Sequence, residues 1–158
     1  MGDATLSIPL MVDLAAVKRD QYQEYSPVFW RPAARAREAH RSFFEKHIVS
    51  GKSICLVHDA DDVLNGFIIG NVISAPPIYN PGGKVCMIDD FVVADPLLWS
   101  TVGTALREET ERRAAMAGAV LLVIVCAQRD EAKRRVLRES GSHVASEWYV
   151  RAIKHRTR

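Results

Sequence analysis

Two adjacent carboxylates are the residues of this sequence best suited to proton chemistry. Asp89 and Asp90 interrupt an otherwise apolar run, KVCMIDDFVVA (84–94). A carboxylate can accept a proton from a reacting group that is held beside it. Neighbouring residues of a strand point to opposite faces, so only one of the two faces a given cleft. We slightly favour Asp89 as the base. The alternative is that both aspartates are only half-exposed polar residues of the strand.

The segment DPLLWSTVGTAL (95–106) follows the carboxylates and turns from strand to helix around one glycine, Gly103. The first N–H groups of a helix have no partner within it and carry a partial positive charge. They can bind a phosphate without help from side chains. Ser100 and Thr101 add hydroxyl donors, or one of them caps the helix. The segment indicates an anion site, and an ordinary strand-to-helix turn is the alternative.

Hydrophobic periodicity and turn residues predict the elements around these residues. Helices are expected at 13–23, from Pro32 to Gly51, at 100–118 and at 129–140, and strands at 53–59, 67–74, 84–94, 119–127 and 143–153, with a short first strand around 4–10. The run AVLLVIVCA (119–127) is apolar at every position, which is typical of a strand buried on both faces beside a parallel neighbour. The helix between 85–94 and 119–127 makes these two strands parallel. We therefore expect one mixed-sheet α/β (α+β) domain over residues 1–158.

Composition narrows the classes of partner and compartment. The net charge of +2 is too small to indicate nucleic acid or an anionic membrane, and no apolar run is long enough to span a bilayer. The three cysteines have neither metal-ligand nor redox spacing, which indicates a reducing compartment. The N-terminus lacks the features of a secretory signal. We expect a cytoplasmic protein that binds neither nucleic acid nor membrane and holds no metal.

The order of these elements resembles that of the GCN5-related N-acetyltransferase (GNAT) superfamily. Gly66-Phe67-Ile68-Ile69 resembles the start of the family's third strand, and MIDDFVVADP (87–96) resembles its fourth strand and the turn after it. EAKRRVLRESG (131–141) resembles the helix after the fifth strand, and ASEWYVRAI (145–153) the closing strand. The match covers about residues 10–153. It implies a GNAT-like mixed, mostly antiparallel twisted sheet flanked by helices, with splayed parallel fourth and fifth strands.

The resemblance also implies a cofactor and a reaction. The cofactor is acetyl-CoA, and the reaction is direct transfer of its acetyl group to a primary amine of a small molecule or peptide. The pantetheine arm would lie against the backbone of the fourth strand and the pyrophosphate on the loop after it. The cofactor-binding residues implied in this way are Phe91, Val92, Val93, Leu98, Trp99, Ser100, Thr101, Val102, Gly103, Thr104 and Arg129.

Four positions depart from the family's pattern. Leu98 stands where an arginine or glutamine is usual, Thr101 where the first glycine is usual, and Arg129 roughly where an asparagine is common. Leu137 stands where many members carry a tyrosine proposed to protonate the leaving thiolate. The alternative is therefore a catalytically impaired GNAT-like module that binds coenzyme A or a protein partner.

Aromatic residues near the expected breaks could line an acceptor pocket. Tyr25, Phe29 and Trp30 lie between the first two helices, and Tyr79 lies in APPIYNPGG (75–83). The same aromatics could instead anchor the helices on the sheet. Lys133 and Arg134 could contact the phosphates of coenzyme A. A last strand at the sheet edge favours a homodimer, by sheet pairing or helix packing.

Overall fold

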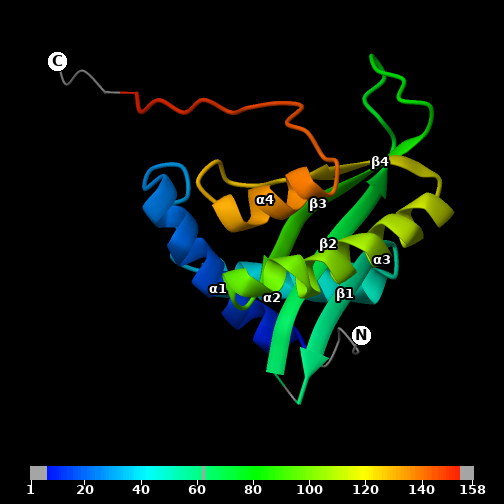
Figure 1. Cartoon of the computed structure of the whole chain (residues 1–158). Coiled ribbons are helices and arrows are strands. Elements are labelled where there is room, and N and C mark those ends of the chain that lie inside the picture. Colours follow the sequence, from blue (N-terminus) through cyan, green and yellow to red (C-terminus); the bar gives the residue numbers. More distant parts are fainter. Residues whose placement is uncertain (1–6, 62, 154–158) are drawn as a thin grey trace.

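The computed structural model describes residues 7–61 and 63–153, and within them the chain forms helices on both faces of one sheet (Figure 1). The helices are α1 (Ile8–Tyr25), α2 (Ala36–Ser50), α3 (Val102–Met116), α4 (Glu131–Glu139) and a short 3₁₀ helix, η1 (Pro96–Ser100). The strands are β1 (Ser53–Ala60), β2 (Val63–Ile73), β3 (Lys84–Val93) and β4 (Ala119–Ile124). None of the described helices has the length and apolar character needed to cross a membrane.

The sheet is mixed, as predicted. Its strand order is β1-β2-β3-β4, with antiparallel pairing between β1 and β2 and between β2 and β3. β3 and β4 are parallel, with Lys84 opposite Ala119 and Ile88 opposite Ile124. This confirms the predicted crossover through a helix, and it brings the carboxyl ends of β3 and β4 to one edge of the sheet.

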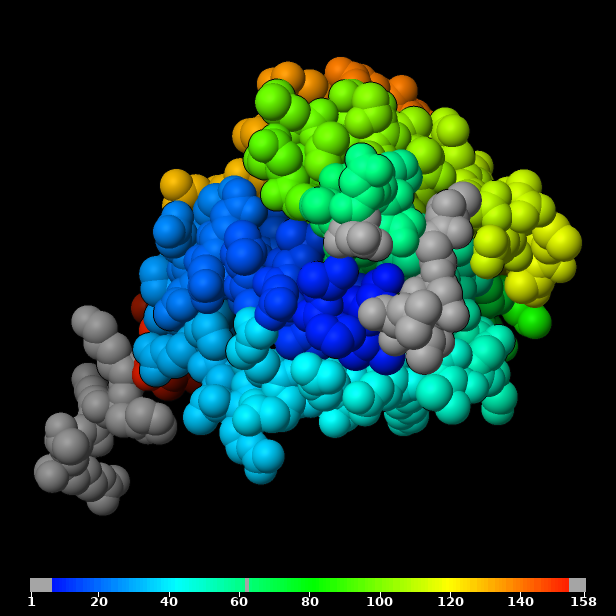
Figure 2. Space-filling model, turned by 90° about the horizontal axis from the view of Figure 1, so that it is seen from below, coloured from blue at the N-terminus to red at the C-terminus, as the bar shows by residue number. Residues whose placement is uncertain are grey.

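Two apolar clusters hold the helices on the sheet. On one face, Met11, Val12 and Ala15 of α1 and Phe44 of α2 pack against the sheet. On the other face, side chains from η1, α3 and α4 pack against Ile68, Ile88 and Phe91, and the residues they contribute are Trp99, Val102, Leu106, Ala114 and Val136. Figure 2 shows the molecule from below, with α1 in blue and α2 in cyan on one side and α3 in yellow-green and α4 in orange on the other.

Gly70 of β2 leaves room for the side chain of Cys86 on the neighbouring strand β3. A Cβ atom at Gly70 would lie 2.8 Å from the sulfur of Cys86 and 3.4 Å from the methyl group of Thr110. The first distance is too short for a real contact, so the site admits only glycine without movement of its neighbours.

The first two helices begin at other residues than predicted. α1 begins at Ile8, so residues 8–10, assigned above to a short strand, form its first turn with Pro9. Proline is tolerated there because the first N–H groups of a helix have no partner within it. Residues 4–6 of that expected strand lie outside the described residues. α2 begins at Ala36 and not at Pro32, which stays in the preceding loop.

The prediction that residues 119–127 are buried on both faces is wrong. β4 ends at Ile124, and among the described residues it has a strand neighbour only on the β3 side. Val120, Leu121, Val123 and Val125 are 51, 49, 39 and 39% exposed. An apolar edge strand is therefore left half uncovered.

The predicted last strand is also absent. Residues 143–153 form no strand, and all of them are exposed. α4 ends at Glu139, and Gly141, two residues later, has a φ of 84°, the left-handed conformation that favours glycine. The N–H groups of Gly141 and Ser142 donate to the carbonyls of Arg138 and Leu137. Figure 1 shows the chain leaving this turn and running away from the sheet.

Candidate functional site

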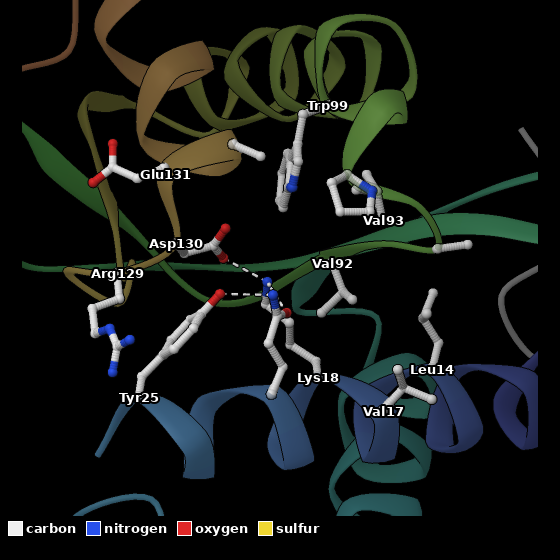
Figure 3. Close-up of a pocket in the computed structure, with 14 residues that line it drawn as sticks. Leu14, Val17, Lys18, Tyr25, Val92, Val93, Trp99, Arg129, Asp130 and Glu131 are labelled. Carbon is white, nitrogen blue, oxygen red and sulfur yellow. Dashed lines mark hydrogen bonds and ion pairs between the residues drawn. The ribbon is translucent and has the colours of Figure 1, made fainter.

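A cavity of about 430 Å³ opens at the carboxyl ends of β3 and β4. This volume lies in the range of small-molecule sites. The residues that line it come from α1, from the end of β3 with the turn after it, and from the loop that starts α4 (Figure 3): Leu14, Val17, Lys18, Gln21, Tyr25, Val92, Val93, Ala94, Pro96, Trp99, Arg129, Asp130, Glu131 and Ala132.

The polar centre of the cavity is an ion pair between α1 and the start of α4. Lys18 Nζ lies 2.5 Å from Asp130 Oδ2, and the two side chains are 15 and 4% exposed. Figure 3 shows Lys18 reaching across from α1 toward Asp130. Asp130 also accepts from the hydroxyl of Tyr22, and its side chain caps α4 by accepting from the N–H of Lys133. Burial, with the charge of Asp130 next, raises the pKa of Tyr22, so the phenol stays neutral.

The loop after β3 presents unpaired amides, as the sequence indicated. Asp95 accepts from the N–H of Leu97, Thr101 N–H donates to Leu98, and Ala105 N–H donates to Thr101. Within the described chain, the N–H groups of residues 102–104 have no acceptor. Ser100 and Thr101 are exposed, and their hydroxyls donate to the carbonyls of Leu97 and Leu98 at 3.4 Å. The positive end of α3 therefore carries three backbone N–H groups without an acceptor, of which those of Val102 and Gly103 belong to buried residues.

Gly103 is explained by Trp99 rather than by the loop. A Cβ atom at Gly103 would lie 2.6 Å from Cε3 of the Trp99 indole. Trp99 is 3% exposed, and its ring packs edge-on against Phe91 with 4.8 Å between centroids. The glycine makes room for a buried tryptophan, so its presence alone says nothing about phosphate.

Lys133 occupies the gap where β3 and β4 separate. The last bond between the strands joins Val125 N–H to the carbonyl of Ile88. Beyond it, Lys133 Nζ donates to the carbonyls of Phe91 and Val125, at 3.1 and 2.9 Å. Lys133 is 2% exposed, and burial lowers the pKa of its ammonium group to about 8.

Neither basic residue that the sequence suggested for phosphate contact is free to make one. Lys133 is buried in the strand gap, and Arg134 donates to the carbonyl of Gln128 and to Glu131. The sequence did hold a signal for Lys133. It stands three residues before Val136, and therefore on the buried face of α4. Lys18 and Asp130 were also missed, because nothing in either segment signals the other.

The two carboxylates lie in different environments. Asp89 is the extra residue of a β-bulge, because Ile69 pairs with Asp90 and the next residue, Gly70, with Ile88. Asp89 is exposed, whereas the side chain of Asp90 is 18% exposed and its Oδ1 lies 3.7 Å from His40 Nε2. Burial, with the charge of Asp89 next, raises the pKa of Asp90 to about 6. A carboxyl with this pKa suits a base near neutral pH. Neither Asp89 nor Asp90 is among the residues that line the cavity.

Arg19 contacts the side of the His40 ring that faces away from Asp90, and this contact fixes the orientation of the ring. Arg19 Nη1 contacts His40 Nδ1, which leaves the ring proton of neutral His40 on Nε2, facing the carboxylate. Burial, with the charge of Arg19 next, lowers the pKa of His40 and keeps it neutral.

The aromatic residues are only partly brought together. Tyr25 lines the cavity, and Arg129 lies over its ring at 5.4 Å. Phe29 and Trp30 contact each other edge-on with 4.6 Å between centroids, beside Tyr22 and outside the cavity lining. Tyr79 lies in the loop between β2 and β3, at the amino end of β3, and is 69% exposed. The structure thus places Tyr79 at the opposite end of the sheet from the cavity.

Three of the predicted cofactor residues form the wall beside the loop. Phe91, Val92 and Val93 are buried, and Val92 and Val93 line the cavity. Leu98 is partly buried against the core, and Arg129 is exposed at the cavity rim. Leu137, at the position expected for a tyrosine, gives no proton donor.

Comparisons with known proteins agree on the fold. No protein-family model and no curated protein matches the chain. Among solved structures, a tetramutant of BH1408 from Bacillus halodurans is 13% identical over 94% of this chain and 95% of that one, with a TM-score of 0.78. A predicted acetyltransferase from Clostridium acetobutylicum, solved with acetyl-CoA, is 15% identical over 96 and 92%, with a TM-score of 0.69. The ribosomal-protein-alanine N-acetyltransferase from Brucella melitensis biovar Abortus 2308 is 18% identical over 97 and 94%, with a TM-score of 0.58. The chain has the GNAT fold.

Proposed function

We propose that this chain is an acyltransferase that moves the acetyl group of acetyl-CoA directly to a primary amine of a small molecule or peptide. The observation that carries the proposal is the row of unpaired N–H groups at residues 102–104, in the helix start that follows Pro96 and Trp99 of the cavity lining. The structural likeness to acetyltransferases, one of them solved with acetyl-CoA, supports it.

The residues around the loop fit coenzyme A chemically. A diphosphate needs hydrogen-bond donors, and three backbone amides at a helix start supply them. The pantetheine arm needs an apolar wall with backbone partners, and Val92 and Val93 provide one along the cavity. The carbonyl of Phe91 already accepts a hydrogen bond from Lys133. The pantetheine arm would therefore bond to the other backbone groups of this wall.

The candidate base is Asp90, with Asp89 as the second carboxylate of the pair. As the amine nitrogen attacks the thioester carbon, Asp90 would accept the proton that the amine loses, and the carbon–sulfur bond would break to release coenzyme A. Leu137 offers no acid, so the sulfur would leave as a thiolate. Tyr25, Phe29 and Trp30 remain the proposed acceptor residues; Tyr79 lies too far along the sheet to join them.

A pair of substitutions at Thr101 tests the phosphate site by isothermal titration with acetyl-CoA. Aspartate and asparagine are equally good caps for α3, but only aspartate places a negative charge beside the amides. We expect Thr101→Asp to weaken acetyl-CoA binding at least tenfold and Thr101→Asn to bind like the parent chain. Absence of binding by the parent at high micromolar acetyl-CoA, or equal affinity of the two variants, would remove the site.

A catalytically impaired coenzyme A-binding or protein-interaction module is the second candidate. Lys133, which fills the gap between the strands, and Leu137 favour it. Binding of acetyl-CoA without transfer to any member of an amine panel would support this second function over the first.

A further inference from the structure

The cavity contains an amine that the proposed reaction does not use. Of the described residues that line it, Lys18 is the only one with a primary amine. Its side chain is 15% exposed, so it belongs to the interior of the site rather than to the outer surface. An acyl donor bound in the cavity would meet this nitrogen, and a lysine amine can attack a carbonyl carbon.

Contacts on several sides hold the nitrogen of Lys18 in place. Nζ lies 2.5 Å from Asp130 Oδ2 and 3.2 Å from Gln21 Oε1. It also lies over the rings of Tyr22 and Trp99, at 4.7 and 5.9 Å from their centroids. In Figure 3 the side chain extends from α1 into the space below Trp99. The amine therefore lacks the freedom of a surface lysine.

Asp130 is placed to take a proton from this amine. Its side chain is 4% exposed, and it accepts from the hydroxyl of Tyr22 at 3.1 Å and from the N–H of Lys133 at 3.4 Å, which fixes the carboxylate. Acyl transfer to an amine needs an unprotonated nitrogen, and a carboxylate in contact with the ammonium group can accept its proton. Lys18 and Asp130 thus form a pair of amine and base inside the cavity.

We propose that Lys18 is acetylated by acetyl-CoA that the chain itself binds. This inference rests on the proposed function, because it needs an acyl donor whose thioester reaches the cavity. The Lys18 ammonium group gives one proton to Asp130, which passes it to solvent, and the neutral Nζ attacks the thioester carbon. The carbon–nitrogen bond forms as the carbon–sulfur bond breaks. The second nitrogen proton leaves with the sulfur as the thiol of coenzyme A, and the third stays on the amide.

Acetylation would change the site that carries it. It removes the positive charge of Lys18 and ends the ion pair with Asp130, whose carboxylate then keeps the neutral donors of Tyr22 and of the Lys133 backbone. Breaking a buried pair by removing one partner destabilises a protein. The acetyl group would also occupy part of the cavity. We therefore expect the acetylated chain to unfold at a lower temperature and to acetylate other amines more slowly.

Three other lysines provide an internal comparison. Lys46, Lys52 and Lys84 are exposed. A reagent that reacts directly from solution reaches exposed amines first, whereas a donor held in the cavity reaches Lys18 first. The order in which the lysines are acetylated therefore distinguishes transfer in the cavity from reaction in solution.

Peptide mapping by mass spectrometry tests the inference on the full chain without an amine acceptor. One arm receives acetyl-CoA, and the other receives acetic anhydride, which needs no binding site. We expect acetyl-CoA to label Lys18 at least about tenfold faster than the exposed lysines, because a bound donor is held beside it, and acetic anhydride to label the exposed lysines first. Lys18→Arg keeps the charge and should abolish labelling at position 18. Lys46→Arg, its matched control on α2, should leave the labelling of Lys18 unchanged.

Asp130→Asn separates the base from the position of the amine. We expect it to slow the labelling of Lys18 at least about tenfold, with thermal unfolding as the check that the variant is folded. Unchanged labelling in this variant would overturn the role of Asp130.

Isothermal titration with acetyl-CoA distinguishes failure of this inference from failure of the proposed function. If the parent binds acetyl-CoA but Lys18 is labelled no faster than the exposed lysines, self-acetylation is overturned and the proposed function stands. If the parent does not bind acetyl-CoA at high micromolar concentration, both are overturned.

Discussion

Lys133 Nζ lies 3.1 Å from the carbonyl oxygen of Phe91, in the gap where β3 and β4 part. A second bond to the carbonyl of Val125 makes the ammonium group a bridge between the two strands. A charge in this position replaces the backbone bonds that the strands no longer exchange. It also makes the gap an internal part of the protein, closed to solvent.

The titration of Lys133 is measurable through stability. Its pKa in the folded chain is lowered from 10.5 to about 8, so between pH 8 and 10.5 the unfolded chain binds more protons and stability rises with pH. We expect the unfolding free energy of the parent, relative to Lys133→Met, to grow by up to about 3 kcal/mol over this range. Urea unfolding at several pH values measures it. Arg134→Met is the control, and a difference that does not change with pH contradicts the prediction.

Asp90→Asn should stabilise the chain while it removes activity. The folded-state pKa of Asp90 is raised from 3.8 to about 6, so its charge opposes folding fully above pH 6 and not at all below pH 3.8. We expect the variant to gain about 1–3 kcal/mol at pH 7.5, with the gain disappearing in acid. Turnover should fall about 100-fold or more, if Asp90 is the base. Asp89→Asn should change neither stability nor turnover by much. A loss of stability in Asp90→Asn would contradict the raised pKa assigned to Asp90.

The pH dependence of catalysis gives an independent view of Asp90. A base must be deprotonated to act, so kcat/KM should rise with pH through an apparent pKa near 6, the value of this carboxyl. Steady-state assays with a single amine between pH 5 and 8 measure the profile. A rise that follows only the pKa of the amine itself, with no inflection near 6, would assign the proton to solvent instead.

Gly103 and Trp99 should behave as one unit. Gly103→Ala adds a methyl group 2.6 Å from the indole, and we expect a loss of about 1–3 kcal/mol in unfolding free energy. In the Trp99→Leu background the smaller side chain leaves room, so the same change should cost less than about 0.5 kcal/mol. A double-mutant cycle by denaturant unfolding gives the coupling. Additive effects would show that the glycine serves the loop and not the tryptophan.

The parts of the fold that depend on local pattern could be predicted from the sequence. The crossover between β3 and β4 follows from a long helix between two apolar runs, and the unpaired amides after Asp95 follow from the start of that helix. The exposure of β4 and of residues 143–153 could not be predicted, because the sequence shows how apolar a strand is but not whether a neighbour covers it. Likewise, the spacing between Lys133 and Val136 shows that Lys133 faces inward. It does not show that two backbone carbonyls there accept hydrogen bonds from its ammonium group.

The candidate site was predictable only where it depends on the backbone. Asp89 and Asp90 looked equivalent in the sequence, and the bulge between β2 and β3 is what separates them. Lys18 and Asp130 were invisible as a pair, since nothing in either segment signals the other. Tyr79 was predicted to line the acceptor pocket because it is an aromatic residue in a proline-rich loop. In the structure this loop lies at the opposite end of β3 from the cavity.

The ion pair of Lys18 with Asp130 joins residues 112 positions apart, and this has a consequence for how the protein is made. On a ribosome that adds about 5–20 residues per second, Lys18 is added to the chain roughly 6–22 s before Asp130. During that interval α1 can pack its apolar side on the growing sheet, but its lysine has no carboxylate to meet. The cavity is therefore completed late in synthesis, when the start of α4 arrives and locks the first helix to the last.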